Sequence, residues 1–197
     1  METKTDREQF EEIFRTYIKR EGASALLDWI CRTDFFTAPA SAKYHLSVEG
    51  GLCKHSLNVY RRLLKLAQEE YGEQWENKIS HESIALCGLL HDLCKVDYYK
   101  QDLRNVKKDG RWEQVPYYTI EEKLPYGHGE KSVYIINGFL RLTREEALAI
   151  NWHMGGFDDR VRAGCRSTSI VYSQYPLSIL LHLADLKATF LDEPLGE

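Results

Sequence analysis

Apolar residues recur at the spacing of amphipathic helices along most of the chain. They fall at i, i+3, i+4 and i+7, so one side of each helix faces a core. Gly22 ends the first helix, Ser80 is the N-cap of a later one, and Thr143 with Glu146 forms a capping box. The helices predicted in this way cover residues 7–20, 23–32, 52–70, 81–95, 130–141, 143–153 and the segment after Pro176.

Residues 96–120 depart from the helical period. Val106 and Val115 flank the dipeptide Asp109-Gly110, which favours a tight turn between two strands. The chain is therefore predicted to be all-α, a helical bundle with a small β-hairpin insert. The insert mixes basic and aromatic side chains, which can hold a phosphate and stack on a base or simply pack across the hairpin: Lys100, Arg104, Lys107, Lys108, Tyr98, Tyr99, Trp112, Tyr117 and Tyr118.

Length and composition restrict the class of protein. A chain of 197 residues is typical of one domain, and we expect residues 1–38 to form N-terminal helices that pack on a core domain of residues 39–197. The formal charge of −4 offers no general attraction to nucleic acid or an anionic membrane. No apolar run is long enough to span a membrane and the first residues lack a signal-peptide pattern, which favours a cytoplasmic protein. The five cysteines include no CxxC pair and are interpreted as reduced thiols.

The position of one histidine carries the first indication of chemistry. His91 is followed directly by Asp92 at the end of the strongly apolar helix SIALCGLLHDLCK. Burying such groups costs several kcal/mol unless they are paired or bound to a metal. Imidazole nitrogen and carboxylate oxygen are the usual protein ligands of Zn, Mn, Fe and Ni. The doublet therefore points to a metal site completed from distant segments.

Four other residues in apolar or glycine-rich surroundings can supply the missing ligands. Asp185 is the most informative, since a single carboxylate within LLHLADLKATFL is otherwise a buried charge. A salt bridge with Lys187 or a neighbouring arginine is the alternative. His182 is best explained as a core histidine, and His45 as a loop residue. The candidate ligands are His55, His128, His153 and Asp185.

The order of these motifs resembles the HD-domain metal-dependent phosphohydrolases. GGLCKHSLNV, LLHDLCK, GHG, WH and a late LADL follow one another over residues 39–190. The resemblance implies an HD-domain helical bundle, with the signature ligands at His55, His91, Asp92 and Asp185. His128 and His153 match the additional ligands of the members that bind two metal ions.

The resemblance also implies a mechanism. Asp92 would bridge two divalent ions, drawn from Mn, Fe, Ni, Co, Zn and Mg, and the histidines with Asp185 would complete the two coordination shells. Two such ions lower the pKa of a shared water, which attacks phosphorus, and they polarise the phosphoryl oxygens. Asp92 and Lys95 are thus the predicted catalytic residues.

Cationic side chains near the ligands are candidates for phosphate binding. Lys95 follows His91 by four residues, which places both on one face of a helix, although a lysine there can also complement the helix dipole. The loop after His153 adds arginines that can pair bidentately with phosphate oxygens or remain solvated. The predicted substrate-binding residues are Lys95, Arg160, Arg162 and Arg166.

The expected substrate is a nucleotide or a short oligonucleotide, cleaved at a phosphomonoester or phosphodiester. The segment KYHLSVEGGLCKHSLNV is most similar to the HD domain of bacterial 3′-to-5′ exoribonucleases. Those proteins carry an OB-fold module ahead of that domain, whereas residues 1–38 read as helix, so no large nucleic-acid platform or membrane partner is expected. A one-metal 5′-nucleotidase and a non-catalytic nucleotide-binding module are the alternatives.

The first helix, with Phe10, Phe14 and Tyr17, can pack on its own core or in a homodimer.

Overall fold

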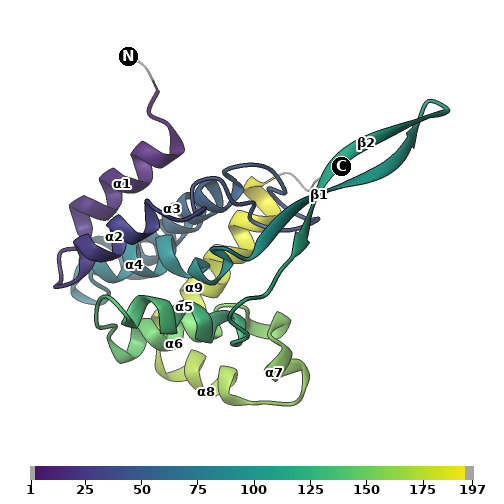
Figure 1. The fold of residues 1–197 in the computed structure, drawn as a ribbon. Helices are drawn as coiled ribbons and strands as arrows, with labels where there is room; N and C mark the ends of the chain where they lie inside the picture. The colour runs from purple at the N-terminus through teal and green to yellow at the C-terminus, as the bar shows by residue number, and fades with distance from the viewer. Residues whose placement is uncertain (1–2, 194–197) are drawn as a thin grey trace.

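The computed structural model describes residues 3–193 and confirms the all-α prediction with one hairpin (Figure 1). A 3₁₀ turn, Gly72–Asn77, follows the helix Gly51–Tyr71, and a π turn, Ala188–Asp192, follows the helix Pro176–Lys187. The main elements of the described part are α1 (Asp6–Tyr17), α2 (Ala23–Ile30), α3 (Gly51–Tyr71), α4 (His81–Leu90), β1 (Tyr99–Lys108), β2 (Arg111–Ile120), α5 (His128–Asn137), α6 (Arg144–Trp152), α7 (Asp159–Arg162), α8 (Ser167–Gln174) and α9 (Pro176–Lys187).

The core lies between α3, α4, α6 and α9. The helix α3 packs against α4 and α9, and α6 packs against α5 and α9. The predicted apolar face of α1 is buried, because Phe10 and Phe14 join the same hydrophobic cluster as Leu57 and Leu86. The N-terminal helices therefore share one core with α3 and α4. The domain boundary expected at residue 38 stays a prediction.

Two glycines allow the helices that carry the candidate ligands to approach closely. A Cβ atom on Gly88 of α4 would lie 2.6 Å from the Cα atom of Tyr60 on α3. A Cβ atom on Gly129 of α5 would lie 2.4 Å from the carbonyl oxygen of Asn151 on α6. Any larger residue at these positions would push the helix pairs apart.

The caps predicted for α4 and α6 are confirmed, but the end of α4 is not. The Ser80 hydroxyl accepts from the Ser83 N–H, and Thr143 with Glu146 forms the expected capping box. The helix ends at Leu90 rather than at Lys95, and a 3₁₀ turn follows over Leu93–Lys95. The backbone at Asp92 leaves the helical region, with φ −100° and ψ 18°. Lys95 therefore lies in a 3₁₀ turn, and the prediction that it shares one helix face with His91 is wrong.

The segment 155–167 was expected to be a loop, and it contains a 3₁₀ turn, Gly155–Phe157, and the short helix α7. The helix α8 was not predicted. Only Thr168 and Val171 of α8 are buried, so its apolar pattern is too sparse to indicate a helix.

The hairpin has the predicted turn. Lys108 pairs with Arg111, so Asp109 and Gly110 form a two-residue loop, with φ of 50° and 83°. Positive φ at both positions is the requirement of a type I′ turn. The strands extend away from the helical body, while their base lies beside it (Figure 1).

None of the described helices is long and apolar enough to cross a membrane.

Candidate metal centre

The structure brings all six predicted metal ligands together at one end of the helical core. They come from α3, the end of α4, the start of α5, the end of α6, and α9. The groups His55–His91–Asp185 and His91–Asp92–His153 each place three ligand atoms within 4.8 Å of one another. Helix packing thus assembles residues that lie up to 130 positions apart in the chain. The six residues are His55, His91, Asp92, His128, His153 and Asp185.

Asp92 occupies the middle of this cluster. Its Oδ1 atom lies 2.8 Å from Nε2 of His128 and 3.6 Å from Nε2 of His153. Its Oδ2 atom lies 3.5 Å from Nε2 of His55 and 3.6 Å from Nε2 of His91. The two carboxylate oxygens therefore face two different pairs of imidazoles.

Two of the histidines are held in the orientation that a metal ligand needs. Nδ1 of His91 donates to the carbonyl of Gly88 at 3.0 Å, and Nδ1 of His153 donates to the carbonyl of Ile150 at 2.7 Å. Because a carbonyl oxygen only accepts, Nδ1 carries the proton and Nε2 presents a lone pair to the cluster. Nε2 of His153 is buried and has no hydrogen-bond partner within the described chain. The donor set fits a divalent ion, which would supply that partner.

His55 is oriented by a residue that the sequence analysis did not single out. Its Nδ1 atom lies 3.0 Å from Oε1 of Glu193, and Asn58 donates to the same oxygen at 3.0 Å. His45, expected in a loop role, precedes α3 and lies close by, with Nε2 3.9 Å from Oε2 of Glu193. On the other side of the ring, Nε2 of His55 is 3.3 Å from Oδ1 of Asp185.

Asp185 faces His55 rather than Lys187, so the sequence-based salt bridge with Lys187 is not formed among the described residues. Burial raises the pKa of the Asp185 carboxyl, but the hydrogen bond and charge of His55 outweigh burial and lower it below the ordinary value. His182 lies one turn earlier on α9 and bonds through Nδ1 to the His153 carbonyl at 2.6 Å. It supports the segment that carries His153.

The electrostatics of the buried cluster differ from ring to ring. Burial lowers the pKa of His91 to about 3, which keeps this imidazole neutral. Burial also opposes protonation of His55, but hydrogen bonds to Asp185 and Glu193 raise its pKa to about 9. Burial disfavours the charged form of Asp92, yet the charge of Lys95 and the hydrogen bond from His128 hold the pKa of this carboxyl well below its usual value. Asp92 is therefore an anion in the interior.

Lys95 pairs with that anion. Its Nζ atom lies 2.6 Å from Oδ2 of Asp92 and donates to the Ala40 carbonyl at 2.6 Å. Burial lowers the pKa of Lys95, but the charge of Asp92 more than compensates and raises it above the ordinary value. The ammonium group thus contacts the cluster and a loop carbonyl.

The cluster opens into a cavity of about 630 Å³. His55, Asp92, His128 and Asp185 form part of its wall, and Lys95 and Arg162 add positive charge. Aromatic side chains from four separate segments complete the lining, and Tyr44, Phe157 and Phe190 among them are exposed at the surface. These aromatic residues are Tyr44, Tyr99, Phe157 and Phe190.

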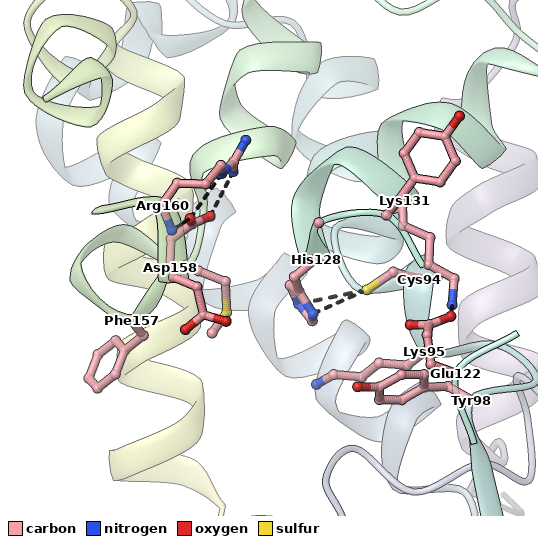
Figure 2. Close-up of a pocket in the computed structure, with 13 residues that line it drawn as sticks. Cys94, Lys95, Tyr98, Glu122, His128, Lys131, Phe157, Asp158 and Arg160 are labelled. Carbon is pink, nitrogen blue, oxygen red and sulfur yellow. Dashed lines mark hydrogen bonds and ion pairs between the residues drawn. The ribbon is translucent and has the colours of Figure 1, made fainter. Parts of the chain in front are cut away.

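A second cavity of about 350 Å³ adjoins His128 (Figure 2). Figure 2 shows Asp158 and Arg160 across this cavity from Cys94 and Lys131. Arg160 pairs with Asp158 at 2.6 Å and with Glu130, so its charge is largely neutralised by protein carboxylates.

The remaining predicted arginines differ in position. The guanidinium of Arg162 lies 6.0 Å from the ring centre of Phe157 and lines the cavity of the cluster. Arg166 is exposed and is not among the residues that line either of these two cavities. The structure therefore brings Lys95 and Arg162 to the cluster, Arg160 to the adjoining cavity, and leaves Arg166 outside both.

Comparisons with known proteins agree with the predicted family. The HD domain model matches residues 52–186. A dihydroneopterin 2′,3′-cyclic phosphate phosphodiesterase from Methanocaldococcus jannaschii is 31% identical over 87 residues, which is 43% of this chain and 31% of that protein. The match thus spans less than a third of that relative. No solved structure matches significantly. The chain belongs to the HD domain family, as the order of its histidine and aspartate motifs predicts.

Proposed function

We propose that the protein is a phosphohydrolase whose six clustered ligands, four of them buried, hold two divalent metal ions. The observation that carries the proposal is the position of Asp92, whose Oδ1 faces His128 and His153 while Oδ2 faces His55 and His91. Asp185 would complete the set on the His55 side. A carboxylate shared between two imidazole pairs is the arrangement expected of a bridging ligand.

Divalent ions bound here would supply Lewis acidity for a phosphoryl group and lower the pKa of water. The chain's own residues supply the rest. Lys95 contacts Asp92 and lines the cavity. Its positive charge would stabilise the negative charge that grows on a phosphoryl group bound there. Arg162, on the same cavity wall, can pair with a further phosphate oxygen.

The substrate class that fits the cavity is a nucleotide or a short oligonucleotide. Tyr44, Phe157 and Phe190 present exposed rings around the opening, and Tyr99 lines the wall at the foot of the hairpin. Aromatic side chains hold a planar base by stacking, while the phosphate would lie against the cluster. The similarity to a dihydroneopterin 2′,3′-cyclic phosphate phosphodiesterase from Methanocaldococcus jannaschii supports a phosphate ester as the substrate.

A one-metal 5′-nucleotidase is the second candidate. His55, His91 and Asp185 bring their ligand atoms within 4.8 Å of one another without any contribution from His128 or His153. The two candidates differ in the number of ions per chain. If the protein saturates at one ion, and His128→Ala leaves both the ion and the activity intact, the one-metal enzyme is the correct description.

The proposal is tested by hydrolysis assays on purified protein with each of Mn²⁺, Fe²⁺, Co²⁺, Ni²⁺, Zn²⁺ and Mg²⁺. Nucleoside monophosphates, cyclic nucleotides and dinucleotides are the substrates, and released phosphate, nucleoside or nucleotide product is measured. We expect hydrolysis that depends on metal, stops with a chelator and is lost in Asp92→Ala. Asp28→Ala, at an exposed position of α2, is the matched control and should keep full activity. No hydrolysis with any metal, or equal turnover in Asp92→Ala, would contradict the proposal.

A further inference from the structure

The carboxylate of Glu193 reaches the candidate metal centre from the far end of the chain. We propose that Glu193 is a positioning residue, which fixes the ring of His55 so that Nε2 faces Asp92 and Asp185. The inference rests on the proposed function, since it assigns to His55 the role of a metal ligand. It adds a residue outside the predicted ligand set and gives the chain's last described segment a part in assembling the site.

The contacts of Glu193 support this role. Its side chain has no exposed surface, and both of its oxygens lie near Nδ1 of His55, at 3.0 and 3.1 Å. An ionised carboxylate only accepts hydrogen bonds, so Nδ1 is the donor. The amide of Asn58 donates to Oε1 at 3.0 Å and fixes the carboxylate in turn. The ring of His55 is thereby held with Nε2 directed toward Asp92, 3.5 Å away.

The position of His55 within its helix explains why a distant carboxylate is needed. His91 and His153 are the C-caps of α4 and α6, and each donates through Nδ1 to a carbonyl three residues earlier. Carbonyls in the last turn of a helix have no partner inside the helix and are free to accept. His55 lies within α3, where the backbone carbonyls already bond to the helix itself. Its Nδ1 therefore requires an acceptor from outside the helix.

A specific local structure brings Glu193 to this place. The π turn Ala188–Asp192 follows α9, and the Glu193 N–H donates to the Ala188 carbonyl at 3.1 Å. The preceding residue, Asp192, accepts from Nε of Arg62 at 2.7 Å. His55, Asn58 and Arg62 follow one another at helical spacing along one side of α3. Two adjacent acidic residues thus fasten the tail to the helix, but only Glu193 contacts a candidate ligand.

The contrast between these two acids gives the test. Glu193→Ala removes the acceptor of His55, whereas Glu193→Gln keeps an oxygen that can accept from Nδ1. Asp192→Asn weakens the other tail contact and leaves His55 untouched, so it is the matched control. Losing the partner that orients a metal-bound histidine typically weakens metal affinity about 10- to 100-fold. We expect a loss of that size in Glu193→Ala, a smaller loss in Glu193→Gln and none in Asp192→Asn.

The readout is metal binding itself, with Co²⁺ and Mn²⁺ as probes. Purified full-length variants are titrated, Co²⁺ coordination is followed by visible absorption, and bound metal is counted by elemental analysis. Circular dichroism of the metal-free variants confirms that each is folded. A Co²⁺ spectrum altered in Glu193→Ala and restored in Glu193→Gln would identify an effect on ligand geometry.

Several outcomes would overturn the inference. If Glu193→Ala binds Co²⁺ with wild-type affinity and spectrum, Glu193 does not position a ligand. If all three variants lose the same affinity, the tail acts as a structural fastener and the bond to His55 has no particular role. Failure of the wild type to bind either ion at any accessible concentration would overturn the proposed function itself, and this inference with it.

Discussion

Glu146 and Asp92 are both buried carboxylates, but they differ in how fully the protein satisfies their hydrogen bonds. The Glu146 side chain has no exposed surface, and Arg20 meets it with two hydrogen bonds of 2.8 and 2.9 Å. Ser83 donates to it at 2.7 Å, and the backbone N–H of Thr143 donates at 2.8 Å. Each oxygen of Glu146 is therefore satisfied by the protein, which ties α4 and α6 to the segment between α1 and α2.

Asp92 is buried to the same degree, but its surroundings are incomplete. Lys95 and His128 make close contacts with it, while the Nε2 atoms of His55 and His91 lie 3.2 Å apart and face each other. Nε2 of His153 is buried and has no partner within the described residues. The self-contained network around Glu146 stabilises the fold, whereas the network around Asp92 leaves ligand atoms that could hold a metal ion.

The largest expected effect on stability is at the complete network. Arg20→Ala leaves Glu146 as an unpaired buried anion, which costs about 3–5 kcal/mol of unfolding free energy. Chemical denaturation measures the loss, and metal content per folded chain should stay at the wild-type value. The control is Arg15→Ala, since Arg15 is 57% exposed and only 3.7 Å from Glu11, so its loss costs at most about 1 kcal/mol. Equal losses in the two variants would contradict the structural role of the Glu146 network.

Metal should stabilise the incomplete network and not the complete one. A metal present at 100 times its dissociation constant stabilises the folded state by about 2.7 kcal/mol. We expect the melting temperature to rise with added metal, to fall back with a chelator, and to stay unchanged in Asp92→Ala. Arg20→Ala should have a lower melting temperature without metal and should still show the full rise when metal is added. A rise of equal size in Asp92→Ala would place the metal elsewhere.

A smaller effect on stability is expected when His153, whose Nε2 lacks a partner among the described residues, is removed. His153→Leu replaces a buried ring by an apolar side chain and removes the donor to the Ile150 carbonyl, which costs about 1–3 kcal/mol. Metal affinity, by contrast, should fall by more than about 100-fold, since even outer partners of a metal ligand are worth 10- to 100-fold. Denaturation of the metal-free protein and metal titration separate the two effects. A variant that loses stability but keeps the wild-type metal affinity would contradict the role of His153 as a metal ligand.

The most gradual effect is the pH dependence of the complete network. Burial raises the pKa of Glu146, but hydrogen bonds from Arg20 and Ser83 outweigh burial and lower it below its ordinary value of 4.5. A lowered pKa in the folded state means that the stabilisation is present above pH 4.5 and is lost as the pH falls through the folded-state pKa. The difference in unfolding free energy between wild type and Glu146→Gln should therefore shrink in acid. A constant difference from pH 7 to pH 3 would contradict the lowered pKa.

Local patterns predicted the elements whose signals lie within a few residues. The period of apolar residues predicted α1, α3 and α9, and Asp109-Gly110 predicted the hairpin turn. The candidate ligands were singled out because histidine and aspartate in strongly apolar helices need compensation, and because their order resembles that of the HD domain family. Sequence reasoning was therefore most informative where an ionisable side chain lies within a strongly apolar segment.

The residues that the sequence did not reveal depend on contacts between distant segments. Glu193 contacts His55 across 138 positions and lies after the last helix, where no periodic pattern marks it. The premature end of α4 at Leu90 arises as the backbone turns at Asp92 inside the cluster. Arg160 was predicted from its charge and its place after His153. Its pairing with Glu130, 30 residues away, depends on its bond to the Asn151 carbonyl of α6, which packs beside α5.

The most direct test of the account is elemental analysis of the purified wild type beside Asp92→Ala. Asp92 contacts both pairs of imidazoles, so its loss should remove every bound ion. The account predicts about two divalent ions per chain in the wild type after loading, and close to none in the variant, with both proteins folded. A wild type that stays empty after reconstitution, or a variant that retains its metal, would contradict it.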